Sequence, residues 1–369
     1  MKMIPAMMLV AFSGAASASG FQLMEQNASG IGNAYAGSAA VAENASTIYF
    51  NQAGMTQLKD LEISGGVSAI RPSYKFTNNG STSPSAIGGG LATGTNGGDA
   101  GGWGVVPNGY ASWALTKDVY VGLGFGAPFG LRTEYSPDWV GRFQSVSFDI
   151  KTININPSVA YRVNEKVSLG FGVNWQQINA EYVRQSILGS QVKLSLDDSA
   201  WGWNAGALFT LSPSTKVGVS YRSAIKYSTS GTFRGAVNAD AKADLKVPDT
   251  FILSVAQKLS DKWEMLGDVT RTGWSSIPKV DIMNTSTNSL AQTLDTNYKN
   301  TWRVALGANT KNTEALKLKF GLAYDQPPVQ SSVTRLTSLL ENNPVCFSTG
   351  VHTRLTRLRC SISEWPICT

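Results

Sequence analysis

The sequence predicts an all-β protein: a transmembrane antiparallel β-barrel with a separate N-terminal segment held inside its lumen. From about residue 58 onward, apolar residues alternate over runs of roughly 12 to 20 residues, whereas strands of soluble proteins usually have five or six. The faces opposite these apolar residues are mostly small and uncharged, and charged residues make up only 15% of the chain. Short turns also alternate with long loops, as they do in outer-membrane barrels.

Residues 1–18 are predicted to be a secretory signal peptide. Lys2 precedes an apolar run, and the small residues Ala16, Ser17 and Ala18 follow it, which predicts cleavage before Ser19. A buried N-terminal helix is the alternative interpretation. The apolar run is too short to cross a bilayer, and no later stretch reaches about 18 apolar residues. The mature chain is therefore predicted to be exported and to span a membrane only as strands.

Residues 19–57 are predicted to form a plug. They are rich in Gly, Ala, Ser and Asn, contain no Lys or Arg, and have only Glu25 and Glu43 as carboxylates. They show neither a sustained helical stripe nor strand alternation. Such a segment cannot bury enough apolar surface to fold alone, so we expect the strands to enclose it.

Residues 58–329 are predicted to be the barrel, with about 11 recognisable strands by the alternation criterion. The clearest strand has Val167, Leu169, Phe171, Val173 and Trp175 on one face. The other predicted strands are Leu61–Ala69, Val105–Leu115, Val119–Tyr135, Ile153–Val163, Val192–Leu211, Lys216–Arg234, Val247–Leu259, Trp263–Met283, Tyr298–Ala308 and Leu316–Tyr324. Apolar faces are expected to meet lipid and small polar faces the lumen.

The strand Val119–Leu131 has an unusual inner face. Its odd-numbered residues are apolar, while the opposite face carries Gly122, Gly124, Gly126, Pro128 and Gly130. We expect this face to be empty, and Pro128 to withhold a ladder hydrogen bond, so a kink or gap in the wall is predicted. The alternative is a smooth strand that makes room for the plug.

The plug sequence resembles the N-terminal hatch of the FadL family of outer-membrane transporters. The resemblance rests on the runs GFQL, SGIGNAYAG, AENAST and FNQAGM, in this order. It implies a monomeric barrel of 14 strands in the outer membrane of a Gram-negative bacterium, surrounded by outer-membrane lipids. It also implies passive uptake of long-chain fatty acids or other hydrophobic molecules. The family has Asn-Pro-Ala where this chain has Asn51-Gln52-Ala53, and Gln52 does not fix the turn as Pro would.

A second resemblance concerns the exit route. The run GFGAPFGLRTEY is similar to the family's third strand, whose inward kink opens the lumen sideways to the membrane. This resemblance assigns the lateral opening to Gly122, Gly124, Gly126 and Pro128. Apolar cargo favours such a route because each methylene returned to water costs about 0.8 kcal/mol.

Candidate ligand contacts come from the hatch and from inward cations. The resemblance places Phe21, Leu23 and Met24 near the bound substrate. A fatty-acid carboxylate requires a cation or several hydrogen-bond donors. By alternation the inward cations are Arg162, Arg222, Arg303, Lys317 and Lys319. We predict that Arg162, Arg303 and Lys317 contact the ligand. The alternative is that these cations pair with groups of the plug.

Other function classes find little support in the sequence. The single histidine, His352, offers no credible catalytic base, and no cluster has metal-ligand spacing, so no enzyme activity, metal or cofactor is predicted. The net charge of +6 includes no basic cluster interleaved with aromatic residues, so nucleic-acid binding is not predicted. An aromatic-hydrocarbon channel of the same fold, a general porin and a structural barrel remain alternatives.

Residues 330–369 differ from the rest of the chain. All three cysteines (Cys346, Cys360 and Cys368) and His352 lie here. The run CFSTGVHTRLT still looks like a strand of the family, while the residues after it do not. We expect an anomalous tail produced by a disturbed reading frame. A divergent natural tail with a disulfide is the alternative.

Overall fold

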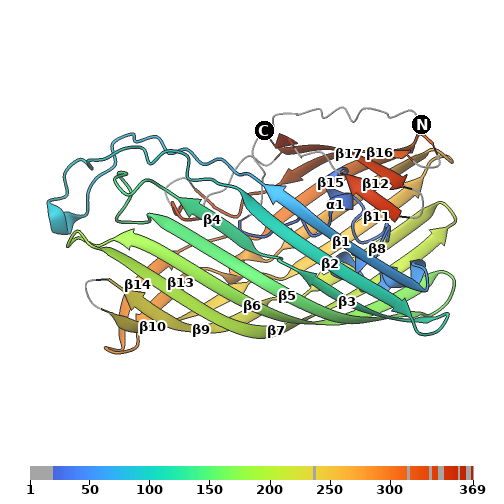
Figure 1. Ribbon diagram of the computed structural model, residues 1–369, viewed down its shortest axis with the longest axis horizontal. Coiled ribbons are helices and arrows are strands. Elements are labelled where there is room, and N and C mark those ends of the chain that lie inside the picture. Colours follow the sequence, from blue (N-terminus) through green and yellow to red (C-terminus); the bar gives the residue numbers. More distant parts are fainter. Residues whose placement is uncertain are drawn as a thin grey trace.

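The computed structural model describes residues 20–235, 238–313, 316–331, 335–339, 345–355, 358–362 and 367–368, with side chains up to residue 353. These residues form one sheet of 19 strands in which the ladders between strands are antiparallel. Figure 1 shows the strands tilted around a lumen, with the long axis horizontal. The predicted signal peptide lies outside the described residues. No helix within them is long and apolar enough to cross a membrane.

The strands follow one another around the wall in nearly sequential order. Their bounds are β1 Leu61–Ile70, β2 Gly104–Ala114, β3 Val119–Gly126, β4 Gly130–Glu134, β5 Ser147–Arg162, β6 Val167–Gln185, β7 Gln191–Ser212, β8 Thr215–Arg222, β9 Ile225–Arg234, β10 Ala239–Val247, β11 Thr250–Lys258, β12 Trp263–Thr272, β13 Lys279–Asn284, β14 Ser289–Asp295, β15 Thr301–Lys311, β16 Leu316–Asp325, β17 Val345–Leu355, β18 Leu358–Ile362 and β19 Ile367–Cys368.

The number of strands exceeds the predicted number partly because several predicted strands are each divided into two. β3 and β4 both pair with β5, and β8 and β9 both pair with β7. Four strands, β10, β14, β18 and β19, were not predicted. β10 alternates small apolar residues with Asp and Lys, so one of its faces is charged, and the other three are short. β17 continues the sheet against β16, so the strand expected at CFSTGVHTRLT is present.

The predicted inside and outside of the barrel are correct for the half near the short turns. Along β5, Ile153, Ile155 and Val159 are exposed, while Asn154 and Asn156 between them are buried. An exposed apolar belt with a buried polar interior is the arrangement that a lipid-facing barrel requires.

The pattern reverses in the half near the long loops, which was not predicted. Further along β5, Phe148 and Ile150 point inward and are buried, whereas Lys151 is exposed on the outer face. β6 and β7 show the same reversal, with buried Ile178 and Leu196. The outer face is therefore apolar at one end and polar at the other, and the lumen has the opposite arrangement. Such a barrel rises beyond the membrane surface and carries an apolar interior with it.

Residues 20–57 lie in the lumen at the short-turn end, as the plug prediction requires (Figure 1). This hatch contains only short elements: α1 Ala28–Ile31, α2 Thr47–Phe50 and the 3₁₀ helix η1 Gln52–Gln57. The remaining 3₁₀ helices are η2 Ser85–Ile87 in the first long loop and η3 Trp274–Ser276 after β12. Small hatch residues such as Ala40 and Ala53 are fully buried against the barrel wall. Glycines of the wall permit this close approach, since a Cβ at Gly218 would lie 2.0 Å from Ala39 O.

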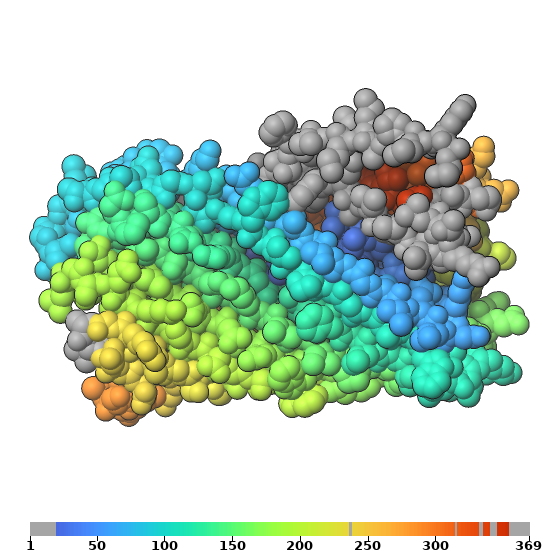
Figure 2. Space-filling model, viewed as in Figure 1, coloured from blue at the N-terminus to red at the C-terminus, as the bar shows by residue number. Residues whose placement is uncertain are grey.

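Among the described residues, β1 is an edge strand of the sheet. β1 pairs with β2 from Leu61↔Trp113 to Ile70↔Gly104, and no other described strand pairs with it. Figure 2 shows dark blue hatch atoms in a hollow between light blue β1 and the orange and red C-terminal strands. Contacts of α1 with both β1 and β17 place the hatch behind this hollow.

Candidate functional site

An apolar cavity lies in the lumen toward the long loops. Apart from Lys246, Thr296 and the Tyr182 hydroxyl, the residues that line it are apolar. They are Phe21, Phe148, Ile150, Ile178, Ala180, Tyr182, Leu194, Leu196, Leu245, Lys246, Ile277, Val280, Ile282, Leu294, Thr296 and Leu339. Most come from inward positions of β5, β6, β7, β13 and β14, above the point where alternation reverses. This composition is suited to an apolar guest and not to a hydrophilic solute.

Phe21 connects the hatch to this cavity. Its side chain is 6% exposed, and its ring lies 5.7 Å from the ring of Phe129 and 5.0 Å from that of Trp274, measured between centroids. Gly20 precedes it with φ of +64°, and a Cβ at Gly20 would lie 2.7 Å from Trp274. Phe21 therefore forms part of the cavity floor, as its predicted role as an apolar contact requires. That it touches cargo remains a prediction.

Residues 21–26 are bonded to the interruption between β3 and β4. Leu23 N donates to Pro128 O at 2.8 Å, and Gly130 N donates to Phe21 O at 2.9 Å. The Gln26 side chain adds a bond from Nε2 to Ala127 O at 2.8 Å. The backbone groups freed by the interruption are thus satisfied by the N-terminal segment. We call residues 21–26 the latch.

The interruption is a bulge between β3 and β4, which lie one after the other against β5. Gly126 pairs with Asn154 and Gly130 with Lys151, so three residues on one strand oppose two on β5. The extra residue reverses the facing of the chain, as bulges do. Phe129, which alternation predicts on the lipid face, is instead 3% exposed and packs inside. The predicted kink is therefore present at residues 127–129.

The bulge adjoins a break in the wall. The ladder between β2 and β3 stops at Gly109↔Phe125, although β2 continues to Gly104. Among the described residues, β4 pairs only with β5. The ladder is therefore missing between β4 and the part of β2 that faces it. This gap lies next to Pro128.

The prediction of an empty inner face on residues 119–131 is wrong. A Cβ at Gly122 would lie 2.5 Å from the sulfur of Met55 and 2.7 Å from Cδ1 of Ile48. Equivalent atoms at Gly124 and Gly126 would meet the side chains of hatch or wall residues. Gly122 and Gly124 make room for the plug, which was the alternative interpretation. Of the predicted opening residues, Gly126 and Pro128 adjoin the bulge, and their part in release remains a prediction.

The predicted inward cations all contact the hatch. Each donates at least one hydrogen bond to it: Arg162 to Thr56 O, Arg222 to Tyr49 O at 3.0 Å, Arg303 to Ala34 O at 2.6 Å, Lys317 to Glu43 at 2.9 Å and Lys319 to Ser29 O at 2.8 Å. None of the five lines the apolar cavity. The structure thus brings Arg162, Arg303 and Lys317 together with the plug and not with Phe21. Leu23 and Met24 also lie outside the cavity lining, with Met24 against the hatch cluster of Tyr35 and Phe50.

Glu43 is the ionic anchor of the hatch. Its two carboxylate oxygens bind Lys317 Nζ at 2.9 Å and Lys319 Nζ at 2.5 Å, and His352 Nδ1 lies 3.8 Å away. Burial alone would raise the pKa of Glu43, but the ammonium groups of Lys319 and Lys317 outweigh it and hold this pKa well below its usual value. The carboxylate therefore stays ionised and bound near neutral pH.

Asn51, Gln52 and Ala53 form a regular turn despite the missing proline. Asn51 caps η1, with its Oδ1 accepting from Ala53 N at 3.1 Å and its Nδ2 donating to Ala207 O of β7 at 2.9 Å. Gln52 takes the first helical position, where proline is favoured but not required. Its side chain donates to Ile48 O at 2.8 Å. The substitution therefore leaves the turn intact.

The sequence did not identify the wall residues of the cavity, although it identified Phe21. They lie on the face that the argument assigned to a small polar lumen, and a signal for them exists: the phase of alternation changes near Thr152, Gln176 and Ala200. Charged residues such as Glu181 then appear on the outer face while apolar residues move inside. A change of phase within one unbroken strand marks the level where the wall leaves the membrane.

The fold and this site define a plugged outer-membrane barrel that handles hydrophobic compounds. A family model described as "Outer membrane protein transport protein (OMPP1/FadL/TodX)" matches residues 9–351. The chain belongs to this family, and it is an outer-membrane β-barrel of a Gram-negative bacterium, in a family of transporters of hydrophobic compounds. The resemblance stated from the hatch motifs is confirmed.

Individual relatives agree with this assignment. The chain is 32% identical to outer membrane protein P1 of Haemophilus influenzae, over 95% of this chain and 85% of that protein. It is 25% identical to the long-chain fatty acid transport protein of Escherichia coli strain K12, over 90% and 83% of the two chains. Among solved structures, a FadL homologue of Pseudomonas aeruginosa superposes with a TM-score of 0.79 at 21% identity, covering 92% and 88%. The Pseudomonas putida toluene transporter TodX gives 0.64 at 16% identity, covering 91% of each chain.

Proposed function

We propose that this protein takes up long-chain fatty acids or other hydrophobic molecules through the apolar cavity and releases them sideways into the outer membrane. The observation that carries the proposal is a cavity whose wall is nearly all apolar and whose floor is a hatch residue, Phe21. Passive movement is sufficient, because a chain of methylenes gains about 0.8 kcal/mol for each group buried. The E. coli relative named as a long-chain fatty acid transport protein supports this class of cargo.

The latch supports a route from the cavity to the bilayer. It occupies the bulge beside the break between β2 and β4, and Phe21 at its start also borders the cavity. A guest that displaces Phe21 would weaken the two backbone bonds that tie the latch to Pro128 and Gly130. The freed bulge would then connect the lumen with the lipid phase.

Uptake by a cavity variant tests the proposed cargo site. Leu196 lines the cavity and is 5% exposed. Leu196→Asp should reduce uptake of labelled oleate at least tenfold in cells, because a carboxylate in an apolar site opposes an apolar guest. Leu196→Met is the matched control and should transport normally. Both variants are compared at equal amounts of inserted barrel, measured by heat-modifiable gel mobility. Equal uptake by both would contradict the proposal.

Deletion of Pro128 tests lateral release. Removing one residue of the bulge lets residues 126–130 pair regularly with β5, so the wall should close beside β4. Oleate uptake should then fall strongly while oleate binding to the purified protein is retained. Pro128→Ala keeps the bulge and should lower uptake less. Full uptake by the deletion variant would favour passage through a displaced hatch.

The alternatives within this fold make different predictions. A general porin passes hydrophilic solutes, whereas here the short-turn half of the lumen holds the hatch, so liposomes should not swell in sugar solutions. An aromatic-hydrocarbon channel would use the same cavity. Toluene and decanoate can each be tested as competitors of bound oleate. Stronger competition by toluene than by decanoate would assign the cargo to aromatic compounds.

A further inference from the structure

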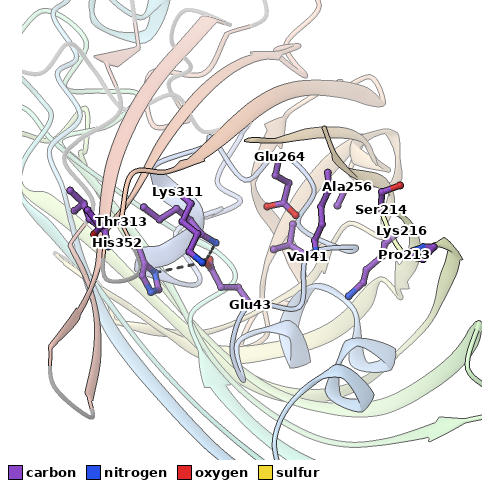
Figure 3. Close-up of a pocket in the computed structure, with 13 residues that line it drawn as sticks. Val41, Glu43, Pro213, Ser214, Lys216, Ala256, Glu264, Lys311, Thr313 and His352 are labelled. Carbon is purple, nitrogen blue, oxygen red and sulfur yellow. Dashed lines mark hydrogen bonds and ion pairs between the residues drawn. The ribbon is translucent and has the colours of Figure 1, made fainter. Parts of the chain in front are cut away.

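A second cavity, of about 380 Å³, lies at the short-turn end of the lumen, below the hatch. Figure 3 shows its lining side chains in two groups, with Glu43, Lys311, Thr313 and His352 on one side and Pro213, Ser214 and Lys216 on the other. In outer-membrane barrels the short turns are periplasmic. We call this cavity the periplasmic vestibule. The apolar cavity has none of these residues in its lining.

The vestibule is basic. Six neighbouring strands of the wall, β8, β11, β12, β15, β16 and β17, each contribute one ionisable residue to its lining. These residues are Lys216, Lys258, Glu264, Lys311, Lys317 and His352. The hatch adds one carboxylate, Glu43. Four lysines therefore face two glutamates, which is a net charge of +2 with His352 neutral.

Both carboxylates of the vestibule already have partners. Glu43 binds Lys317 and Lys319, and Glu264 Oε2 accepts from Asn309 Nδ2 at 2.9 Å. Lys216 Nζ donates to the neutral side chain of Gln57 at 3.0 Å. Within the described residues, Lys258 Nζ makes no hydrogen bond or ion pair. Among the lining residues, the basic groups thus outnumber the acidic groups by two.

The arrangement also works against the stability of the sheet. Lys311 and Lys317 are direct cross-strand partners on β15 and β16, and Lys216 and Lys258 lie diagonally on β8 and β11, since Lys216 pairs with Ala256. Like charges on facing positions destabilise a sheet. Glu43 offsets this repulsion beside Lys317, and a bound anion would offset it beside Lys216 and Lys258.

We propose that the periplasmic vestibule binds a small oxyanion with two negative charges, of the phosphate class, held mainly by Lys216 and Lys258. The size of the cavity suits a small molecule and not a peptide. The net charge of the lining matches a dianion. Phosphate oxygens accept hydrogen bonds from several ammonium donors at once. This site is separate from the path proposed for hydrophobic cargo.

Calorimetric titration of the purified full chain in a nonionic detergent at low salt tests the proposal. Inorganic phosphate should bind saturably at about one site per chain, and Lys216→Gln/Lys258→Gln should bind at least tenfold more weakly. The charge-matched control is Lys226→Gln/Lys242→Gln, which removes two exposed lysines of β9 and β10 and should bind like the parent. Lys258→Gln alone should have an intermediate effect, and it breaks no hydrogen bond or ion pair within the described residues.

Further ligands identify the source of the anion. Glycerol 3-phosphate that binds as tightly as phosphate would assign the site to phosphomonoesters, and tenfold weaker binding would assign it to free phosphate. Acetate that binds as tightly as phosphate would overturn the dianion assignment. Absence of saturable phosphate binding to the parent, or equal binding by the Lys216→Gln/Lys258→Gln variant, would overturn the site. Oleate uptake by that variant should be unchanged, so failure here leaves the proposed transport function untouched.

Discussion

Phe21→Ala should release the latch from the bulge without unfolding the barrel. The ring is 6% exposed, and its burial contributes about 1.5–3 kcal/mol. Its contacts with Phe129 and Trp274 add about 0.5–1.5 kcal/mol each as aromatic pairs. At the lower end of these ranges, alanine removes about 3 kcal/mol from a segment held otherwise by a few hydrogen bonds. Since 1.4 kcal/mol is a factor of ten, the detached latch should become about 100-fold more populated.

Hydrogen exchange measures this directly at two amides. Leu23 N and Gly130 N are bonded across the latch to Pro128 O and Phe21 O, so both should exchange about 100-fold faster in Phe21→Ala. Ile48→Ala removes a fully buried side chain elsewhere in the hatch and is the matched control. It should leave these two amides near the parent rate. Unchanged exchange at Leu23 and Gly130 in Phe21→Ala would refute the idea that Phe21 holds the latch closed.

Three further predictions concern the fit of the hatch. Glu43→Gln should loosen it by about 3 kcal/mol, because it leaves the buried ammonium of Lys319 without its counter-ion, and proteolysis of the hatch should accelerate in a folded barrel. Because the folded pKa of Glu43 is lowered, its contribution is complete above the unfolded pKa of about 4.5 and is lost as pH falls through the folded value. Hatch proteolysis should therefore be equal at pH 7 and pH 6 and rise only below about pH 4.5. Gly122→Leu should force Ile48 aside, cost about 1–3 kcal/mol and lower the thermal midpoint. Gly267→Ala is the control: no atom lies within 4 Å of the new Cβ, so the thermal midpoint should not fall.

Much of the wall could be predicted because its alternation has a single physical cause. In β6 the odd-numbered residues from Val167 to Trp175 face lipid, and the residues between them face a polar lumen. The period of the sequence therefore reports burial directly. The split strands were harder. The break between β8 and β9 depends on their different partners, since β8 pairs with β11 and β9 with β10. β10 and β14 each close a hairpin with the strand before them, but their short length and polar residues gave no apolar face of the expected kind.

The site was predictable only in part. Phe21 and the kink near Pro128 were located from motifs, since a proline in a strand has one main structural consequence. The glycines of β3 were assigned to an opening because sequence does not show that Ile48 and Met55 fill the space beside Gly122. The apolar cavity was missed since a lipid-facing and a lumen-facing residue have the same chemistry here, and only the level of the membrane distinguishes them.

The binding site of the cargo is the central claim, and photo-cross-linking tests it most directly. A diazirine at the end of the alkyl chain of palmitate should label the purified, folded protein within the cavity, at Phe21, Ile178 or Leu196, as located by peptide mass spectrometry. Excess unlabelled oleate should remove the label, and Leu196→Asp should prevent it. Labelling confined to the outward belt around Ile153 and Phe171, unaffected by oleate or by the variant, would contradict the account.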